Sequence, residues 1–384
     1  MKIGVFLPNW IGDVVMATPT LRALRKLVGD EGRLIGVMRP YVSAVLEGTN
    51  WLDSAIFYDP KSKKAELRNR AVIAGLKAQQ LDAVVLLTNS LRTGVLAWLS
   101  GAPRRVGYAR AFRGPLLTDK LRAPISGSTW YGKPRYTPAP VLDYYLETAY
   151  ALGCPPESTK VELGLTEREE AAADAAWQAL GLPHDGKVVV LNSGGAFGAA
   201  KLWPNEYFAQ LARRITTETG RHVLVLCGPS ERDVARDIVR QGADERVVSL
   251  AEQPLSIGLS KACVARAALM VTTDSGPRHF AAAFDVPVVS LFGPTHIAWS
   301  ENHQAGALHL QKRLPCGPCQ QRVCPLGTHQ CMRDLGVDEV FAAVQRQLTL
   351  IAGERVPLVA CPPVRNSTSL PALVDKPPVA HKVA

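Results

Sequence analysis

The sequence predicts an α/β protein made of two successive halves, each a parallel sheet covered by helices, with a central cleft between them. Short apolar runs with the length of buried strands alternate with segments of helical periodicity, which is the pattern of such sheets. The alternation pauses once and starts again, and 384 residues exceed what one hydrophobic core usually holds. Ligands of open parallel sheets bind in the crevice at the carboxyl ends of the strands.

The first series of strands and helices opens the chain. Its strands are predicted at residues 2–7, 34–37, 55–58 and 83–88. A short turn after the first strand leads into an amphipathic helix predicted over 13–27, and a further helix is predicted over 141–152. Residues 112–140 are rich in Gly, Pro and basic side chains and lack periodicity, so they predict a long loop that faces the cleft.

The second series restarts after a connecting segment at residues 153–165. Its strands are predicted at 187–191, 223–227, 247–250, 269–273 and 288–292, and its helices at 205–219, 231–241, 255–268 and 277–284. These boundaries predict a Rossmann-like domain over 1–165 and a second one over 166–350. Residues 351–384 are rich in Pro and poor in aromatic side chains, which predicts a flexible tail.

The positive charge of the chain lies in its first part. Residues 1–150 contain 21 Lys and Arg residues and 11 Asp and Glu residues, which accounts for the whole formal charge of +10. This surplus predicts attraction to a polyanion or to an anionic membrane surface, while a solvated basic face is the plainer alternative. Nucleic acid is excluded as a partner because aromatic side chains that stack on bases are not interleaved with the basic residues.

The apolar segments are too short to cross a membrane. No stretch reaches the roughly 18 consecutive apolar residues that a transmembrane helix needs. Asn9 and Asp13 interrupt the apolar run at the N-terminus, and no small-residue cleavage site follows it, so a secretory signal is not indicated. The sequence therefore predicts a cytoplasmic protein that touches a membrane only from its surface.

A first polar cluster, residues 9–15, lies where the first strand leads into the first helix. Asp13 is predicted at the edge of the cleft, where the partial positive charge of the helix N-terminus should keep its carboxylate ionised. An Asp in a first helical turn commonly stabilises the helix. A transfer to a hydroxyl group, however, needs a carboxylate that accepts the proton of the attacking hydroxyl. The turn lacks the G-x-G-x-x-G pattern of dinucleotide-binding proteins.

A glycine-rich loop follows the first strand of the second series. Gly194, Gly195 and Gly198 are followed by Lys201, and Pro204 suits the first position of the next helix. Backbone amides in such a loop can approach an anion, and Lys201 adds a point charge. A turn alone would explain the glycines, but together with the lysine they favour phosphate recognition.

A third cluster ends the strand predicted at 269–273. Asp274, Ser275 and Gly276 open a helix whose N-terminal amides can hold a diphosphate, and His279 follows one turn later. A capped helix start would explain the Asp or the Ser, but not the added Arg278 and His279. Gly293 and Thr295 end the next strand, so the two loops should form one pocket.

These clusters resemble those of bacterial lipopolysaccharide heptosyltransferases, glycosyltransferase family 9, and most of all the type II members. The resemblance covers about residues 1–345. It is carried by four motifs in the expected order, namely Trp10–Asp13, Ala200–Pro204, Asp274–His279 and Leu291–Thr295. The runs at 89–92 and 101–107 also resemble the acceptor-side segment of type II enzymes.

The resemblance implies a GT-B fold and an inverting transfer of L-glycero-D-manno-heptose from ADP-heptose. The implied acceptor is the first heptose of the inner core on Kdo2-lipid A, at the cytoplasmic face of the inner membrane, where the protein would be peripheral. By the resemblance Asp13 is the general base, and the donor is held by Lys201, Asp274, Ser275, Gly276, His279, Gly293 and Thr295. No catalytic metal is implied, and no Asp-x-Asp pair occurs near the cleft motifs.

Two positions depart from the pattern of the family. Ala196 stands where members often have an acidic residue, and Arg278 stands where a smaller or apolar residue is expected. On the acceptor side, Arg92, Arg104 and Arg105, with Arg110 and Arg113 further on, are predicted to attract the phosphates and acidic Kdo sugars of the acceptor.

A cysteine cluster near the end of the second half is not explained by the resemblance. Cys316, Cys319, Cys324 and Cys331 lie within sixteen residues, with His329 beside the last. They could bind a structural zinc ion, although their spacing differs from paired C-x2-C knuckles, or they could be reduced thiols or labile disulfides.

Two groups of other functions remain open. Heptosyltransferase I, or another family 9 transferase with a different sugar or acceptor, would share the donor motifs. A nucleotide-sugar epimerase or a non-catalytic nucleotide-binding protein would share the two-lobed design, but it would not depend on Asp13.

Overall fold

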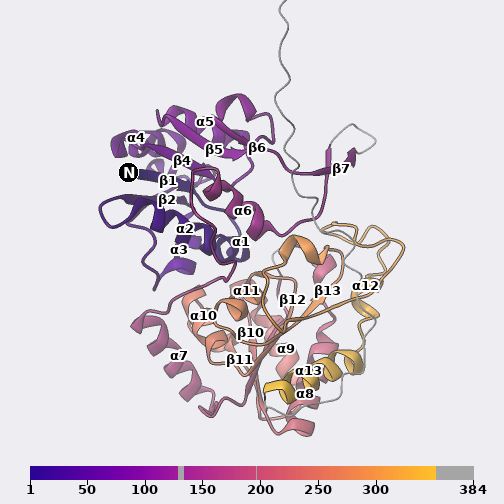
Figure 1. Ribbon diagram of the computed structural model, residues 1–384. Coiled ribbons are helices and arrows are strands. Elements are labelled where there is room, and N and C mark those ends of the chain that lie inside the picture. The colour runs from indigo at the N-terminus through magenta and orange to yellow at the C-terminus, as the bar shows by residue number, and fades with distance from the viewer. Residues whose placement is uncertain (129–133, 196, 352–384) are drawn as a thin grey trace, which may run out of the picture.

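The computed structural model describes residues 1–128, 134–195 and 197–351, and in this part of the chain it shows two α/β halves (Figure 1). The first half contains a parallel sheet with the strand order β3-β2-β1-β4-β5-β6. The strands are β1 (Lys2–Phe6), β2 (Arg33–Met38), β3 (Ser54–Phe57), β4 (Ala83–Leu86), β5 (Arg104–Tyr108) and β6 (Asp119–Leu121). The helices are α1 (Ile11–Met16), α2 (Thr18–Val28), α3 (Pro40–Leu46), α4 (Asn69–Gln79), α5 (Leu91–Leu99) and α6 (Val141–Tyr150).

The second half repeats this architecture with the strand order β11-β10-β9-β12-β13-β14. Its strands are β9 (Val188–Asn192), β10 (His222–Leu226), β11 (Val247–Ser249), β12 (Leu269–Thr273), β13 (Val288–Phe292) and β14 (Leu308–Gln311). Its helices are α7 (Glu167–Ala179), α8 (Asn205–Thr219), α9 (Arg232–Gly242), α10 (Ile257–Ala265), α11 (Gly276–Ala283), α12 (Gln330–Arg333) and α13 (Val337–Ile351). Strands such as β9 and β12 are buried along their whole length, because helices cover both faces of the sheet.

The strand order places the functional motifs. In each half the chain starts in the middle of the sheet, moves outward to one edge, and then returns to build the other side. The reversal lies between β1 and β4 in the first half and between β9 and β12 in the second. Crevices form at the carboxyl ends of strands at such a reversal. Asp13 follows β1, the glycine-rich loop follows β9 and Asp274 follows β12, so all three lie at these two points.

The first half and the connecting segment also touch backbone to backbone. Gly48 of the first half lies so close to Gly164 that a Cβ added at Gly164 would collide with the Gly48 carbonyl oxygen. Lys261 on α10 is fully buried beside this contact. Its ammonium group donates to the Glu47 carbonyl at 2.9 Å and to the Gly164 carbonyl at 3.1 Å, and it pairs with Glu169 Oε1 at 2.9 Å. One side chain therefore joins both halves and the segment between them.

Three sequence predictions about the first half need correction. The helix predicted over 13–27 is two helices, because Pro19 lies in the first turn of α2 and the chain turns at Ala17. The segment predicted as a loop over 112–140 contains β6, which pairs with β5, and the antiparallel hairpin of β7 (Ile125–Ser128) and β8 (Pro134–Tyr136). These strands are short and mostly exposed, so they carry no apolar periodicity. The strand β5 was not predicted, because it begins with two arginines.

The remaining predictions concern the domain limits and the tail. Thr166 begins the second half as the N-cap of α7, where it and Glu169 form a reciprocal capping box. The helix α13 extends to Ile351, and the rest of the predicted tail lies outside the described residues. Among the helices that the structure describes, none has the length and hydropathy needed to span a membrane.

Candidate active site

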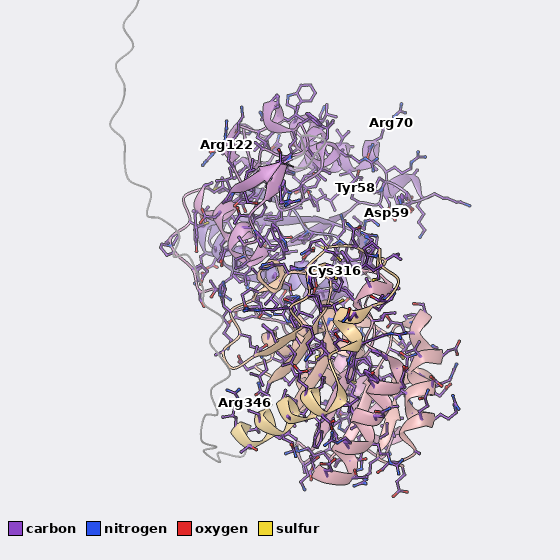
Figure 2. The ribbon with its side chains drawn as sticks, turned by 90° about the vertical axis from the view of Figure 1, so that its right-hand side faces the viewer. Tyr58, Asp59, Arg70, Arg122, Cys316 and Arg346 are labelled. Atoms are coloured by element: carbon purple, nitrogen blue, oxygen red, sulfur yellow. The ribbon has the colours of Figure 1, made fainter. Side chains whose placement is uncertain are left out.

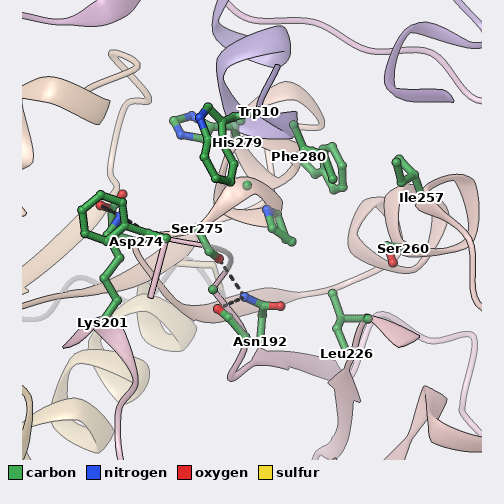
Figure 3. Close-up of a pocket in the computed structure, with 18 of the residues that line it drawn as sticks. Trp10, Asn192, Lys201, Leu226, Ile257, Ser260, Asp274, Ser275, His279 and Phe280 are labelled. Carbon is green, nitrogen blue, oxygen red and sulfur yellow. Dashed lines mark hydrogen bonds and ion pairs between the residues drawn. The ribbon is translucent and has the colours of Figure 1, made fainter. Parts of the chain in front are cut away.

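A cavity of about 810 Å³ lies between the two halves, where the carboxyl ends of their central strands face each other. It is lined by Trp10, Gly12, Asp13 and Tyr41 from the first half, and from the second half by residues that include Asn192, Gly194, Lys201, Glu231, Ile257, Asp274, Ser275, His279, Thr295 and Ser300. Figure 3 shows Lys201 and Asp274 together on one side of this cavity, with Leu226 and Ile257 on the other. One end of the cavity is therefore charged and the other is apolar.

Asp13 is partly exposed in the first turn of α1, at the wall that the first half contributes. Burial and, to a smaller extent, the charge of Asp274 raise the pKa of its carboxyl group, Lys201 partly offsets both, and the resulting pKa is about 6. The sequence predicted that the helix N-terminus would hold this group firmly ionised. At about 6 this pKa still leaves the carboxyl group mostly ionised at pH 7, while burial makes it a stronger base than a free Asp carboxylate.

Lys201 and Asp274 form a buried ion pair opposite Asp13. The Lys201 ammonium lies 2.6 Å from Asp274 Oδ2 and 2.9 Å from the Asp274 carbonyl oxygen. Thr295 Oγ1 donates to Asp274 Oδ2 at 2.7 Å, and Ser300 Oγ donates to Oδ1 at 2.9 Å. Although burial alone would raise the pKa of Asp274, Lys201 and Thr295 together lower it to about 2. The pair places a cation at the cavity and fixes its position.

The glycine-rich loop has no room for side chains at Gly194 and Gly198. A Cβ on Gly194 would collide with the carboxylate of Glu231, and a Cβ on Gly198 would collide with the Arg322 carbonyl oxygen. Gly198 also has a φ of +152°, which favours glycine. The Gly194 carbonyl accepts a hydrogen bond from Thr273 Oγ1 at 2.8 Å, so the loop is tied to β12.

The helix α11 begins at the cavity beside α1. Ser275 is its N-cap residue, and the Ser275 hydroxyl accepts a hydrogen bond from Asn192 Nδ2 at 2.8 Å. A Cβ added to Gly12 would lie 2.7 Å from His279 Cδ2 and 3.3 Å from Gly276 Cα, so α1 and α11 pack at a distance that only glycine permits. This packing brings the amides of α11 to the same cavity as Asp13.

His279 is buried and neutral in this arrangement. Burial and the charge of Arg278 lower the pKa of His279 well below its usual value. Its Nδ1 lies 3.2 Å from Asn302 Nδ2, which can only donate, so the proton of the neutral ring is on Nε2. His279 can therefore donate a hydrogen bond from Nε2 and carries no charge.

Arg278, whose role the sequence left open, supports the loop after β13. It is fully buried, and its guanidinium donates to the Ser300 carbonyl at 2.6 Å and lies 3.3 Å from His309 Nε2. Because Ser300 in turn donates to Asp274, Arg278 holds that loop against the ion pair. Ala196, the other departure from the family pattern, lies outside the described residues.

Most of the predicted donor residues line the cavity, and one does not. Asp13, Lys201, Asp274, Ser275, Gly276, His279 and Thr295 all line it. Gly293 does not, and it packs instead against α12, where an added Cβ would collide with the Met332 side chain. Its small size therefore serves close packing.

The predicted acceptor arginines are separated by the fold. Arg92 is exposed in the first turn of α5, near the carboxyl edge of the first sheet. Arg104 and Arg105 instead begin β5, at the opposite edge from the cavity. Arg104 pairs with Asp119 at 2.7 Å, and Arg105 Nε donates to the Leu116 carbonyl at 2.7 Å, so both guanidinium groups hold local structure.

A polar and aromatic cluster, consisting of Asn89, Tyr108, Arg110, Arg113 and Tyr144, occupies the carboxyl edge of the first sheet. The Tyr108 and Tyr144 rings stack with centroids 3.3 Å apart. Asn89 Oδ1 accepts from Arg113 at 3.0 Å and from the Tyr144 hydroxyl at 3.3 Å. Burial lowers the pKa of Arg113 to about 10, so its guanidinium stays protonated at neutral pH.

Several residues of the cavity were not predicted from the sequence. Glu231 looks in the sequence like an ordinary acid near a helix start, yet its carboxylate lines the cavity and accepts from the Gly228 amide at 2.7 Å. Gln320 also lines it, and the neighbouring Arg322 lies 6.0 Å from the Trp10 ring across the cleft. Both Gln320 and Arg322 belong to the segment between β14 and α12, where the cysteines are the only distinctive signal in the sequence.

The cysteines of that segment are free thiols in the structure. Cys316 is exposed, and Cys319, Cys324 and Cys331 are partly buried. Within the described ranges, no group of three or more His, Cys, Asp or Glu side chains is arranged to hold a metal ion. The predicted structural zinc site thus has no preformed geometry in this part of the chain.

The chain is similar to known proteins over most of its length. Residues 69–330 match the sequence profile of glycosyltransferase family 9 (heptosyltransferase). Lipooligosaccharide heptosyltransferase 2 of Campylobacter jejuni is 26% identical over 91% of this chain and 98% of its own length. Lipopolysaccharide heptosyltransferase 1 of Pseudomonas aeruginosa is 31% identical over 84% of this chain and 87% of its own.

A solved structure supports the same assignment at the level of the fold. ADP-heptose lipopolysaccharide heptosyltransferase II of Escherichia coli superposes with a TM-score of 0.72 at 21% identity, over 91% of this chain and 99% of that one. The predicted GT-B fold is thereby confirmed. The family profile spans more than half of the chain, and we conclude that this protein is a glycosyltransferase and belongs to family 9, the heptosyltransferases.

Proposed function

We propose that this protein transfers L-glycero-D-manno-heptose from ADP-heptose to the heptosyl-Kdo2-lipid A inner core of lipopolysaccharide, with inversion at the anomeric carbon. The observation that carries the proposal is the position of Asp13, a carboxyl group with a pKa of about 6 that lines the same cavity as the Lys201–Asp274 pair. A base near neutral pH is what proton removal from a sugar hydroxyl requires. The heptosyltransferase 2 relative and the motifs that resemble type II enzymes support this acceptor, while the heptosyltransferase 1 relative makes the type I acceptor the alternative.

The second half provides complementary places for each part of the donor. The diphosphate would lie at the N-terminus of α11, where the backbone amides of Gly276 and its neighbours and the ammonium of Lys201 supply positive charge. The Glu231 carboxylate accepts hydrogen bonds and suits the ribose hydroxyls. Leu226 and Ile257 form an apolar wall that suits the adenine ring (Figure 3).

The transfer then follows from these positions. Asp13 takes the proton of the acceptor hydroxyl as that oxygen attacks the anomeric carbon, the bond from this carbon to the diphosphate oxygen breaks, and ADP leaves with both electrons of that bond. Lys201, the neutral His279 and the amides of α11 can stabilise the charge that develops on the diphosphate, so we propose that the step needs no metal cofactor. Because Lys201 is already paired with Asp274, its charge is held in place before the donor arrives.

The first half would bind the acceptor. Arg92 and Arg110 lie near the carboxyl edge of the first sheet, and Arg110 stacks on Tyr136 with its guanidinium carbon 3.5 Å from the ring centroid. This edge opens toward the cavity, so anionic sugars held here would approach Asp13. Arg104 and Arg105 lie at the other edge and are left out of the proposed site. We place the reaction at the cytoplasmic surface of the inner membrane, where such an acceptor is made.

One experiment tests the proposal and separates its two closest variants. The protein is incubated with ADP-heptose and either heptosyl-Kdo2-lipid A or Kdo2-lipid A, and the products are analysed by mass spectrometry. One added heptose on the heptosylated acceptor alone supports the type II reaction, whereas addition to Kdo2-lipid A alone identifies a type I enzyme. The Asp13→Asn variant is the control, and undiminished transfer by it would contradict the assignment of the base.

A further inference from the structure

The outer face of α5 exposes an apolar stripe. Leu91 is 46% exposed and Trp98 is 53% exposed, while Val95 between them is partly exposed. The spacing 91, 95, 98 puts these side chains on one side of the helix. The opposite side, with Thr93, Leu96 and Ala97, is buried, and Leu96 and Ala97 belong to the core on one face of the first sheet. The stripe therefore faces outward from a helix whose other side is packed in the core.

A second apolar side chain stands beside this stripe. Phe112 is 95% exposed and has a φ of +61°, and Ala111 before it has a φ of +51°. Two successive non-glycine residues in the left-handed region are strained, and such strain persists only where the surroundings enforce it. The neighbouring Arg113 holds this backbone in place, because its buried guanidinium donates to the Tyr108 carbonyl at 2.8 Å. Arg113 also packs beside Gly94, so this loop lies against α5.

The surface around these side chains is strongly basic. Residues 57–112 contain ten Lys and Arg residues and three Asp and Glu residues. Lys61, Lys63, Lys64, Arg68 and Arg70 are all exposed, on the segment before α4 and on its first turn. The helix α4 packs against α5, and Figure 2 shows Arg70 and Arg122 on the outside of the first half.

We propose that this face, formed by α4, α5 and the loop at residues 111–113, docks on an anionic lipid bilayer. Aromatic and aliphatic side chains that project from a basic surface suit the boundary between lipid head groups and acyl chains. The positive charge of the face complements the negative charge of an anionic membrane, and for this reason we choose a membrane over a protein as the occupant.

The position of the face fits the proposed reaction, on which this inference rests. The helix α5 begins directly after Asn89 and Ser90, at the carboxyl edge of the first sheet. A lipid-anchored acceptor that lies beside this face would thus have its sugars directed along that edge to the cavity that Asp13 lines. The second half, which would bind the donor, stays on the far side of the first half from the bilayer (Figure 1).

Vesicle flotation tests the inference with the full chain. Vesicles of phosphatidylcholine with about one third phosphatidylglycerol should carry the protein to the top of the gradient, and vesicles of pure phosphatidylcholine should not. The double variant Trp98→Ser, Phe112→Ser should lower the partition coefficient by roughly tenfold. The variant Lys63→Gln, Lys64→Gln, Arg70→Gln should lower it by at least tenfold, and salt should mimic this loss.

Matched controls come from the second half. Leu350 is 55% exposed on α13, and Arg346 is exposed on the same helix, at the opposite end of the molecule from Arg70 in Figure 2. Leu350→Ser and Arg346→Gln should leave flotation unchanged. If the wild type does not float with anionic vesicles, or if Trp98→Ser, Phe112→Ser floats as the wild type does, the inference is overturned and the face would have to serve a protein partner.

Transfer to a fully deacylated, water-soluble acceptor separates this inference from the proposed function. The Trp98→Ser, Phe112→Ser variant should keep wild-type kcat on the soluble acceptor and lose rate only on acceptor embedded in vesicles. Normal transfer to the soluble acceptor without vesicle binding would overturn the docking face alone. Absence of transfer to either acceptor by the wild type would overturn the proposed reaction.

Discussion

Replacing Asp13 by Asn should make the protein more stable and nearly inactive at the same time. Burial and Asp274 raise the pKa of Asp13 from 3.8 to about 6, so keeping it ionised in the folded protein at pH 7 costs up to about 3 kcal/mol at ~1.4 kcal/mol per pKa unit. Because Asp13 is partly exposed, we expect about 1–2 kcal/mol of this to be measurable. The side-chain amide of the Asp13→Asn variant is uncharged in both the folded and the unfolded state, so the variant should escape this cost.

The sign of the effect depends on pH. A carboxyl group whose pKa is raised in the folded state stabilises the fold below its unfolded pKa, and this contribution is lost as the pH rises through the folded pKa. The Tm difference between Asp13→Asn and wild type should therefore grow between about pH 4 and pH 6 and stay constant above pH 7. For a half of this size, about 1–2 kcal/mol corresponds to a Tm increase of at least about 2 °C.

Thermal unfolding followed by fluorescence, with kcat measured from ADP release, tests both effects in one preparation. The loss of the general base should lower kcat by roughly 100-fold or more. Asp30→Asn is the matched control, because Asp30 is exposed and distant from the cavity lining, and it should change neither quantity. A variant with wild-type kcat, or one whose Tm is lower than that of wild type at pH 8, would refute this account of Asp13.

Three further predictions concern the same cavity. The kcat/KM for the acceptor should fall below about pH 6, tenfold per pH unit, as the general base becomes protonated, and initial rates between pH 5 and pH 8 would show it; a flat profile would contradict the assignment. Lys201→Met leaves Asp274 as a buried carboxylate without its cation, so it should destabilise the fold by about 3 kcal/mol, as measured in denaturant titrations. It should also weaken ADP binding, as measured by calorimetry. The control Lys187→Met replaces an exposed lysine and should change neither quantity. Gly12→Ala forces the added methyl group onto His279, so it should separate α1 from α11 and lower kcat at least tenfold. ADP should still bind to the second half of this variant. Unchanged kinetics would show that the two helices can shift apart freely.

The parts of the fold that depend on local pattern were predictable. Fully buried strands such as β9 and β12 contain short apolar runs, at residues 188–191 and 269–271, which are typical of buried parallel strands. The functional side chains follow the central strands, and parallel strands bring their carboxyl ends to one edge, so Asp13 could be placed at the cleft edge of the first sheet and Asp274 at the cleft edge of the second.

The parts that depend on tertiary contact were not predictable. Arg104 and Arg105 follow a turn and look free in the sequence, but the start of a strand lies at the edge of the sheet away from the cavity. Glu231 enters the cavity only because Gly194, far away in the chain, leaves room for its carboxylate. The raised pKa of Asp13 arises from burial between two halves, which no local pattern reveals.

The buried ammonium of Lys261 ties the two halves and the connecting segment together at one point. Its partner Glu169 also caps α7 through its second oxygen, which accepts from the Thr166 amide at 2.8 Å, so the start of the second half is held at the same point. Any swing that opens the cavity while keeping this joint must turn about residues 48 and 164, where backbone meets backbone. For a given rotation, the rim of the cavity farthest from the joint then travels the greatest distance.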